Sequence, residues 1–466
     1  MIRLREDSKL SIRRLGILVG GGPAPGINAV IGAATIEAIN SGIEVIGLYD
    51  GFQWLASDRF DARQHTVQLR IGDVARVHFD GGSFLRTSRC SLLDRERMKT
   101  ETRVQPNEEI VGRVVANLGK LGIDALLTIG GDDTALSARF VSEYAQNSIR
   151  LVHVPKTIDN DLPLPHDVPT FGFSTARFIG TQLVKNLMRD SQTTGRWYIC
   201  ETMGRTAGWL ALSIGMSAGA TLTLIPEEFE DRSKFQHILD VIDGAILKRR
   251  VAGRPDGVVV LAEGLAYKLG DKEELEALLG REVPLDAAGH PRLAEVDLAK
   301  LIKNGLEERF KRRNTPITLV DLELGYELRS ADPTPFDMSY CRSLGYFAVR
   351  MIQDESVPNG VMAAIVNGNL QPFQLSEMAD PVTNRTRTRV VDVCSDMYRV
   401  ARAYMIRLES SDLEKPGMLA ALAAEAKMTP SAFRQHYRRA ATRLPDGLPP
   451  DEPASAQAEP VGTSGE

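Results

Sequence analysis

The sequence has few of the features that would place it in several common protein classes. It contains four cysteines in 466 residues, far apart and without a C-x-x-C pair, so we expect neither a disulfide framework nor a zinc site but reduced, buried thiols. No apolar run approaches the length of a membrane span. The first ten residues, MIRLREDSKL, are charged where a signal peptide needs an apolar stretch. We therefore expect a cytoplasmic protein with no membrane partner.

The chain also lacks a strong charge of either sign. Its formal net charge of −5 argues against general binding to nucleic acid, so an anionic substrate would have to be met by a local basic site. Apolar residues make up 43% and charged residues 25% of the chain, which is typical of a globular protein with a sizeable core. The length suggests two domains.

Apolar, β-rich runs alternate with helical patterns through most of the sequence. The predicted strands cover residues 14–20, 43–49, 125–129, 151–154, 196–200, 220–224, 257–261 and 360–366. Pro25–Asn40, after the first of them, has the length and small residues of a helix. This alternation predicts an α/β fold with a mostly parallel sheet, in which ligands bind at the carboxyl ends of the strands.

Three stretches break this alternation. Residues 267–314 are charged and helix-prone, which suggests an insertion. Residues 385–441 are helical, and within them 417–439 resembles a helix-turn-helix. Because such two-helix segments are common and the chain is acidic, we expect helices packed on the protein body rather than a DNA-binding unit. Residues 441–466 hold five prolines and no basic residue after Arg443, so we expect a disordered tail.

Polar loops follow three of the predicted strands. VGGGPAPGIN (19–28) could bring its backbone close to a phosphate, although a plain tight turn is equally plausible. GGDDT (130–134) suits a magnesium–phosphate site, but Asp132 or Asp133 could instead cap a helix that begins at Thr134.

PKTIDND (155–161) is the most informative of these loops. Three acidic or amide side chains within four residues need compensating charge or hydrogen bonds. A carboxylate beside a metal-bound phosphate can accept the proton of an attacking hydroxyl. A simple Asx-rich turn would not explain why a second acidic loop precedes it by one βα unit.

Three further loops hold isolated polar residues after later strands. They are ETMGRTAGW (201–209), LAEG with Glu263, and GYELRSADP with Tyr326 and Arg329. Arginine suits bidentate recognition of phosphate, and Arg196 lies one strand upstream of the first of these loops. Taken one at a time, such residues are more often solvated surface groups.

In order, the six loops resemble those of the phosphofructokinase family, from about Ile12 to about Val366, with PKTIDND and MGR the most specific. The resemblance implies an α/β fold of two three-layer lobes with mostly parallel sheets and an active site in the cleft between them. The predicted phosphoryl-donor lobe comprises 11–170 and 328–370. The predicted sugar-phosphate lobe comprises 171–327 and 371–440 and includes the insertion.

The resemblance also assigns roles to single residues. Asp159 matches the general base that deprotonates the sugar 1-hydroxyl, and Asp161 the carboxylate that supports it. Asp132 matches the Mg²⁺ ligand. Arg89 matches an arginine that neutralises the transferring phosphoryl group, alongside Lys156.

Binding roles follow from the same comparison. Gly21 and Gly22 lie in the loop that cradles the donor phosphates. Arg196 matches an arginine that family tetramers offer to a neighbouring subunit, so a homo-oligomer, dimer or tetramer, is implied. The sugar-phosphate pocket is assigned to Thr157, Met203, Gly204, Arg205, Glu263, Tyr326 and Arg329, beside Asp159.

Two substitutions address the phosphoryl donor. Members that use ATP resemble this sequence but have glycine in place of Asp133 and of Lys156, which leaves room for the nucleotide α-phosphate. Members that use pyrophosphate look like this chain at both positions. We therefore expect transfer from pyrophosphate to fructose 6-phosphate, reversibly, in glycolysis or gluconeogenesis. An ATP-dependent enzyme is the alternative.

The sequence departs from family patterns at several positions. Tyr326 stands where histidine is common, and ITLVDLEL lacks a second arginine that would cross to the neighbouring subunit. Gly32 and Ile36 replace arginines that bind effectors in allosteric bacterial relatives, so we expect no nucleotide effector site. Two other readings fit less well. NAD and lipid kinases share only the Gly-Gly-Asp loop, and a regulatory subunit would have lost residues such as Asp159.

Overall fold

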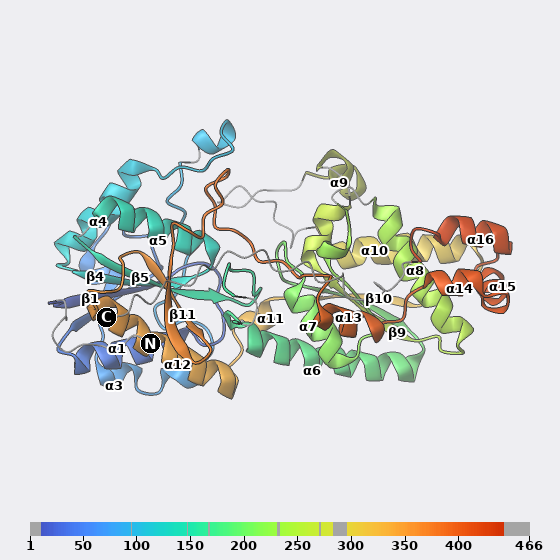
Figure 1. Ribbon diagram of the computed structural model, residues 1–466, viewed down its shortest axis with the longest axis horizontal. Helices are drawn as coiled ribbons and strands as arrows, with labels where there is room; N and C mark the ends of the chain where they lie inside the picture. Colours follow the sequence, from blue (N-terminus) through green and yellow to red (C-terminus); the bar gives the residue numbers. More distant parts are fainter. Residues whose placement is uncertain are drawn as a thin grey trace, which may run out of the picture.

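The chain folds into two α/β lobes that lie side by side, each with its own sheet (Figure 1). The structure is a computed structural model, and it describes residues 11–94, 96–146, 148–165, 168–230, 234–269, 272–282 and 296–441, with the side chains of 99 and 272–275 excluded. The predicted fold class, α/β with mostly parallel sheets, is confirmed.

The first sheet has the order β12-β11-β5-β4-β1-β2-β3, with β6 paired to β5. Its inner strands are parallel, and β3 and β12 add antiparallel edges. The strands are β1 (Arg14–Val19), β2 (Glu44–Leu48), β3 (Thr66–Gln68), β4 (Ala125–Gly130), β5 (Arg150–Thr157), β6 (Phe171–Gly172), β11 (Val361–Val366) and β12 (Asn369–Gln374).

Helices cover both faces of this sheet because side chains on a strand alternate between faces. Leu15 and Ile17 of β1 point into one apolar cluster, with α1 and α12, whereas Leu18 points into another, with α4 and α5. A Cβ on Gly345 of α12 would lie 2.5 Å from the carbonyl oxygen of Val30, so glycine allows α12 to pack tightly on α1. The helices are α1 (Ile27–Asn40), α2 (Ala62–His65), α3 (Ile71–Val74), α4 (Glu108–Lys120), α5 (Asp132–Ala145) and α12 (Pro335–Gln353), with 3-10 turns η2 (Val77–Phe79) and η3 (Arg97–Lys99).

The second sheet is parallel throughout and has the order β10-β7-β9-β8. Its strands are β7 (Trp197–Thr202), β8 (Leu222–Leu224), β9 (Gly257–Ala262) and β10 (Leu319–Leu324). One apolar cluster joins this sheet to its helices. The earlier elements are α6 (Phe173–Thr194), α7 (Trp209–Ala218), η4 (Pro226–Glu228), α8 (Phe235–Val251), η5 (Glu263–Lys268), α9 (Lys272–Leu279), α10 (Leu298–Arg312) and α11 (Tyr326–Arg329).

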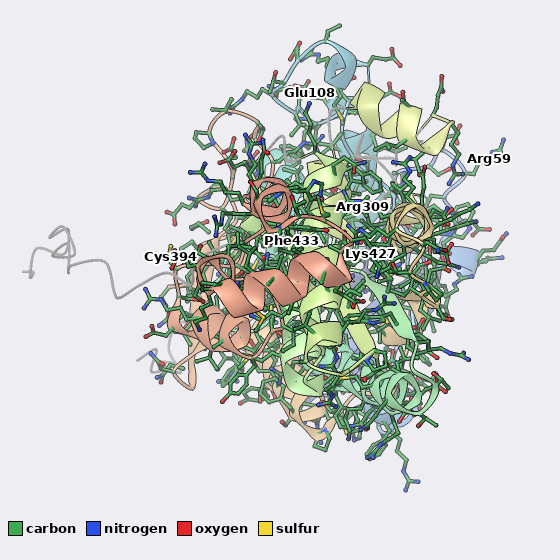
Figure 2. All side chains as sticks on the ribbon, turned by 90° about the vertical axis from the view of Figure 1, so that its right-hand side faces the viewer. Arg59, Glu108, Arg309, Cys394, Lys427 and Phe433 are labelled. Carbon is green, nitrogen blue, oxygen red and sulfur yellow. The ribbon has the colours of Figure 1, made fainter. Side chains whose placement is uncertain are left out.

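The C-terminal helices complete the second lobe. They are α13 (Asp396–Ala403), α14 (Ser410–Glu414), α15 (Pro416–Glu425) and α16 (Pro430–Tyr437). Figure 2 shows this end of the molecule facing the viewer. Leu422 of α15 and Phe433 of α16 are fully buried in the lobe core, which confirms that these helices pack on the protein body. The predicted disordered tail lies outside the described residues, apart from residue 441.

The structure corrects several details of the sequence interpretation. Residues 171–172 and 371–374 pair with β5 and β11, so they belong to the first sheet and not to the sugar-phosphate lobe. Within the predicted insertion, α10 buries Ile302, Leu306 and Phe310 in the second core. This helix is therefore an integral part of the lobe.

The cysteines meet the expectation only in part. All four lie in described segments and none forms a disulfide, but Cys394 is exposed and Cys90 is half-buried, whereas Cys200 and Cys341 are buried. Within the described part of the chain, no helix combines the length and apolarity needed to cross a membrane.

Candidate active site

The loops that follow the strands of the two sheets meet between the lobes. Arg205, after β7, forms an ion pair with Asp132, after β4, with Nη1 and Oδ1 2.6 Å apart. A Cβ on Gly22, after β1, would lie 3.5 Å from Cζ of Arg329, at the end of α11. Residues from both lobes therefore form one site at the carboxyl ends of their strands, as expected for open α/β sheets.

The glycine-rich loop holds a neighbouring segment in place. The amide of Gly21, which has a φ of 82°, donates to the carbonyl oxygen of Ser88 at 2.9 Å. The hydroxyl of Thr87 donates to the carbonyl oxygen of Gly21 at 2.6 Å. These bonds bring Arg89, the next residue along, to this loop.

Lys156, near the end of β5, is buried against the same loop. Its ammonium group donates to the carbonyl oxygen of Gly22, and a Cβ on Gly21 would lie 3.3 Å from Nζ. Burial lowers the pKa of Lys156 to about 8; the charge of Asp159 opposes this shift, and that of Arg329 adds to it. The loop thus approaches a buried cation.

Helix α5 begins at Asp132, two residues before the expected start at Thr134. Gly131 is the N-cap residue, and no side chain caps the helix. The alternative role of Asp132 or Asp133 as the capping residue is therefore wrong. Both carboxylates lie in the first helical turn, where the helix dipole favours negative charge.

A cavity of about 70 Å³ adjoins this helix start. Its lining comes from α5 and from a segment that sequence reasoning did not select: Asp132, Asp133, Leu136, Arg385, Thr386 and Thr388. The hydroxyl of Thr386 donates to the carbonyl oxygen of Asp132 at 3.3 Å. The alternating R-T-R-T-R sequence at 385–389 is the one nearby feature that could have indicated a role for this segment in the site.

The TIDND residues form a tightly held, buried turn. The amide of Asp159 donates to Oγ1 of Thr157 at 3.0 Å, and Asn160 adopts a left-handed conformation with a φ of 57°. Asp159 and Asp161 are only 8% and 7% exposed. Burial, then the charges of Asp159 and Asp132, raise the pKa of Asp161 to about 8. Several carboxyl groups therefore interact in this part of the site.

Glu263 shapes the loop that holds the MGR triplet. Its Oε2 accepts hydrogen bonds from the amides of Gly204 and Arg205 at 3.2 and 3.0 Å. These residues have φ values of 158° and 52°. Burial raises the pKa of Glu263. Glu263 is therefore a buried part of the site and not a solvated surface residue. Met203 is also buried, and a Cβ on Gly325 would lie 3.1 Å from its Cε.

Two predicted residues lie at or beyond the edge of this site. Tyr326 is 67% exposed, and the guanidinium of Arg329 lies 5.3 Å from its ring centroid. Arg196 precedes β7, whereas Met203 follows it, so the two lie at opposite ends of the strand, roughly 20 Å apart. Within one chain Arg196 does not reach the site, and its role toward a neighbouring subunit stays a prediction.

Comparisons with known proteins point to one family. The phosphofructokinase family model matches residues 14–352. A protein of Thermotoga maritima named pyrophosphate–fructose 6-phosphate 1-phosphotransferase is 52% identical over 91% of this chain and 98% of its own length. A protein of the same name from Naegleria fowleri is 44% identical over 92% of this chain and 96% of its own length. A protein of Clostridium perfringens named ATP-dependent 6-phosphofructokinase 2 is 33% identical over 75% of this chain and 88% of its own length.

Solved structures support the fold. The pyrophosphate-dependent phosphofructokinase of Marinobacter aquaeolei superposes with a TM-score of 0.59 at 19% identity, over 86% of this chain and 93% of that one. The phosphofructokinase of Pichia pastoris gives the same TM-score at 21% identity over 92% of this chain, which spans 40% of that longer protein. With a matched family model and relatives of high identity over nearly its whole length, this chain belongs to the phosphofructokinase family.

Proposed function

We propose that the protein transfers a phosphoryl group from pyrophosphate to the 1-hydroxyl of D-fructose 6-phosphate. The products are fructose 1,6-bisphosphate and phosphate, and the reaction is reversible and serves glycolysis or gluconeogenesis. The observation that carries the proposal is the buried ammonium group of Lys156 beside the glycine-rich loop. The relatives at 52% and 44% identity support it, since both are named for pyrophosphate, whereas relatives at 33% identity include proteins named for either donor.

The donor preference follows from size and charge. Lys156 lies against Gly21 and Gly22, where it offers a positive charge to the oxygens of a bound diphosphate. Asp133 lines the cavity next to Asp132, so it would repel the α-phosphate of a nucleotide. Pyrophosphate ends where that extra phosphate would begin, and it avoids this repulsion.

We assign the proton transfer to Asp159. The sugar 1-hydroxyl attacks the terminal phosphorus, its proton passes to the Asp159 carboxylate, and orthophosphate leaves. The bond between the Asp159 amide and Thr157 fixes the backbone that carries this carboxylate. Lys156 and Arg89 supply positive charge around the moving phosphoryl group. Arg205 and Arg329, from the second lobe, would hold the sugar phosphate.

The residues of the site fit a magnesium ion. The described residues contain no group of three metal-ligating side chains, but Mg²⁺ is commonly held by one or two carboxylates together with phosphate oxygens and water. Burial, then the charges of Asp159 and Asp132, raise the pKa of Asp161, so a divalent cation would relieve the repulsion among these three carboxylates. Asp132 would hold Mg²⁺ with pyrophosphate and water, and the ion would neutralise donor oxygens.

Three further properties belong to the proposal. The protein acts in the cytoplasm, and it forms a homo-oligomer in which Arg196 serves a neighbouring subunit. It lacks the nucleotide effector site of allosteric relatives. A Cβ on Gly32 would lie 3.1 Å from the carbonyl oxygen of Val74, so any side chain at that position of helix α1 would be crowded against the backbone of α3.

A donor-site variant tests the steric argument. Asp133→Gly with Lys156→Gly should raise KM for pyrophosphate about 10- to 100-fold, since a charged hydrogen bond contributes about 1.5–3 kcal/mol, and should let ATP serve as a donor. Steady-state rates with each donor measure this change. The pair Lys303 and Asp321, joined at 2.8 Å on the second lobe, provides a matched control when both become alanine. An unchanged donor preference in the site variant would remove the argument.

A further inference from the structure

The chain between β12 and α13 passes from the first lobe to the second alongside the site (Figure 1). We call residues 384–391 the crossing segment. At its start, Asn384 accepts a hydrogen bond from Arg139 of α5 at 2.9 Å through Oδ1. At its end, the amide of Val391 donates to Oε1 of Glu227 at 2.9 Å, and the same oxygen accepts the amide of Gly208 at 2.9 Å. The segment is therefore bonded to both lobes.

Arg389 is the most enclosed polar side chain of the crossing segment, at 6% exposure. Its guanidinium donates to several oxygens of the turn that follows Asp159. Nε and Nη2 donate to the carbonyl oxygen of Asn160 at 3.1 and 3.0 Å, and Nη2 also reaches its Oδ1 at 2.6 Å. Nη1 donates to the carbonyl oxygens of Leu164, Pro165 and Val168 at 3.3, 2.7 and 2.9 Å.

The backbone of Arg389 adds two contacts in opposite directions. Its amide donates to the carbonyl oxygen of Asp161 at 2.7 Å, while its own carbonyl oxygen accepts Nε1–H of Trp209 at 3.0 Å. Trp209 is the first residue of α7 in the second lobe. One residue thus ties the acidic turn to the lobe that carries the MGR triplet.

A guanidinium is suited to this place. Buried carbonyl oxygens need donors, and the planar fork of arginine offers five N–H groups in a fixed geometry, whereas lysine offers three on a flexible stem. The turn itself is strained at Asn160, so external bonds help to hold its shape. An error of about 1 Å in the position of a reacting group can cost on the order of 100-fold in rate.

We propose that Arg389 is a positioning residue, which holds residues 160–165 and 168 so that the carboxylate of Asp159 reaches the sugar hydroxyl. This inference rests on the proposed function, because it assumes Asp159 as the base. It assigns to the crossing segment a role in the chemical step in addition to its role in joining the lobes.

Arg389→Lys tests the proposal against a matched control. Arg150 lies at the start of β5, at the opposite end of that strand from the site. Its guanidinium likewise donates to backbone carbonyl oxygens, those of Met351, Asp354 and Val357. Arg150→Lys should lower the melting temperature and leave kcat unchanged. Arg389→Lys should lower kcat about 10- to 100-fold, with KM for fructose 6-phosphate within about threefold of wild type. Amide hydrogen exchange in residues 159–168 should rise only in the Arg389 variant.

A kcat for Arg389→Lys that matches the Arg150 control, or a loss confined to KM, would overturn the proposal. If Arg389→Lys does not fold, Trp209→Phe is the second test, because it removes the donor to the Arg389 carbonyl oxygen and keeps an aromatic side chain. A lower kcat with faster exchange in 159–168 would support the positioning role, and an unchanged kcat would refute it. Wild-type rates with pyrophosphate are measured first. Silence there would contradict the proposed donor, while the exchange comparison still tests Arg389.

Discussion

At the scale of single residues, the site depends on which charged groups the fold buries together. Asp161 and Lys156 are each less than a tenth exposed, and burial disfavours their charged forms. The pKa of Lys156 falls to about 8 and that of Asp161 rises to about 8, mainly because of burial. Such opposed shifts in one cleft are typical of functional sites.

Replacing the assigned base tests this residue-scale account. Asp159→Asn should lower kcat by about 10²–10⁴, because the amide cannot accept the hydroxyl proton, while KM for fructose 6-phosphate changes little. Steady-state kinetics measures both parameters. Asp124→Asn, at the amino end of β4, is the control and should retain wild-type kcat. A near-normal kcat for the Asp159 variant would show that another group removes the proton.

The residues that were predicted belong to short sequence motifs, whereas the missed residue is buried by contacts with a segment far away in the sequence. GGDDT and PKTIDND each lie in one loop after one strand, so their residues could be selected from short stretches of sequence. Arg389 contacts Asn160, which lies 229 positions away in the sequence. Because arginine is ordinarily a surface residue, nothing near position 389 indicates that its side chain is buried. Glu263 was selected, but its bonds to the turn at 204–205 depend on how β7 and β9 pair.

At the scale of elements, the strands buried along their length were predictable, including the edge strand β8, and the half-exposed edge strands were not. Strands such as β4 and β9, which are buried along their whole length, read as continuous apolar runs. The half-exposed strands β3, β10 and β12 lack such runs, and β6 has only two residues. In α10, abundant lysine, arginine and glutamate obscured an apolar stripe that packs into the second core.

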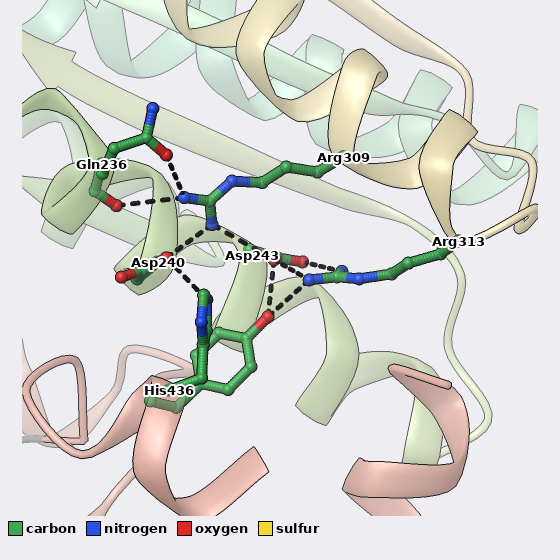
Figure 3. Close-up of polar contacts among 7 residues, drawn as sticks. Gln236, Asp240, Asp243, Arg309, Arg313 and His436 are labelled. Carbon is green, nitrogen blue, oxygen red and sulfur yellow. Dashed lines mark hydrogen bonds and ion pairs between the residues drawn. The ribbon is translucent and has the colours of Figure 1, made fainter. Parts of the chain in front are cut away.

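A polar cluster fixes helix α16 to the rest of the second lobe (Figure 3). Asp243 of α8 is fully buried and accepts two hydrogen bonds from Arg313, at 2.6 and 2.5 Å. The hydroxyl of Tyr437, from α16, donates to the same carboxylate at 2.6 Å. Burial and then the charge of Asp243 raise the pKa of Tyr437, so its hydroxyl stays protonated as a donor. Arg309 and His436 both contact the neighbouring Asp240.

Removing that hydroxyl measures what the cluster contributes. Tyr437→Phe should lower the free energy of unfolding by about 2 kcal/mol, because it takes one donor from a buried carboxylate and leaves the ring in place. Urea unfolding gives the value. Tyr404→Phe, at a position that is 80% exposed, is the matched control and should have no effect. Equal stability of the two variants would show that Arg313 and Arg309 satisfy Asp243 without the hydroxyl.

At the scale of the whole molecule, the two lobes contribute complementary groups to one site. The first lobe brings the glycine-rich loop, the acidic turn and Lys156, and the second brings Arg205 and Arg329. The crossing segment and the ion pair between Arg205 and Asp132 join them. The fold class and this shared site could be predicted from ordered loops in the sequence. The path of residues 384–391 could not, because it depends on how the finished lobes pack.

The central claim is that this arrangement transfers phosphoryl groups from pyrophosphate. Initial rates with fructose 6-phosphate and Mg²⁺, with pyrophosphate or ATP offered in parallel, test it most directly. The account predicts turnover with pyrophosphate and little or none with ATP. Turnover with ATP alone would contradict the donor argument built on Asp133 and Lys156, and no turnover with either would contradict the proposed function itself.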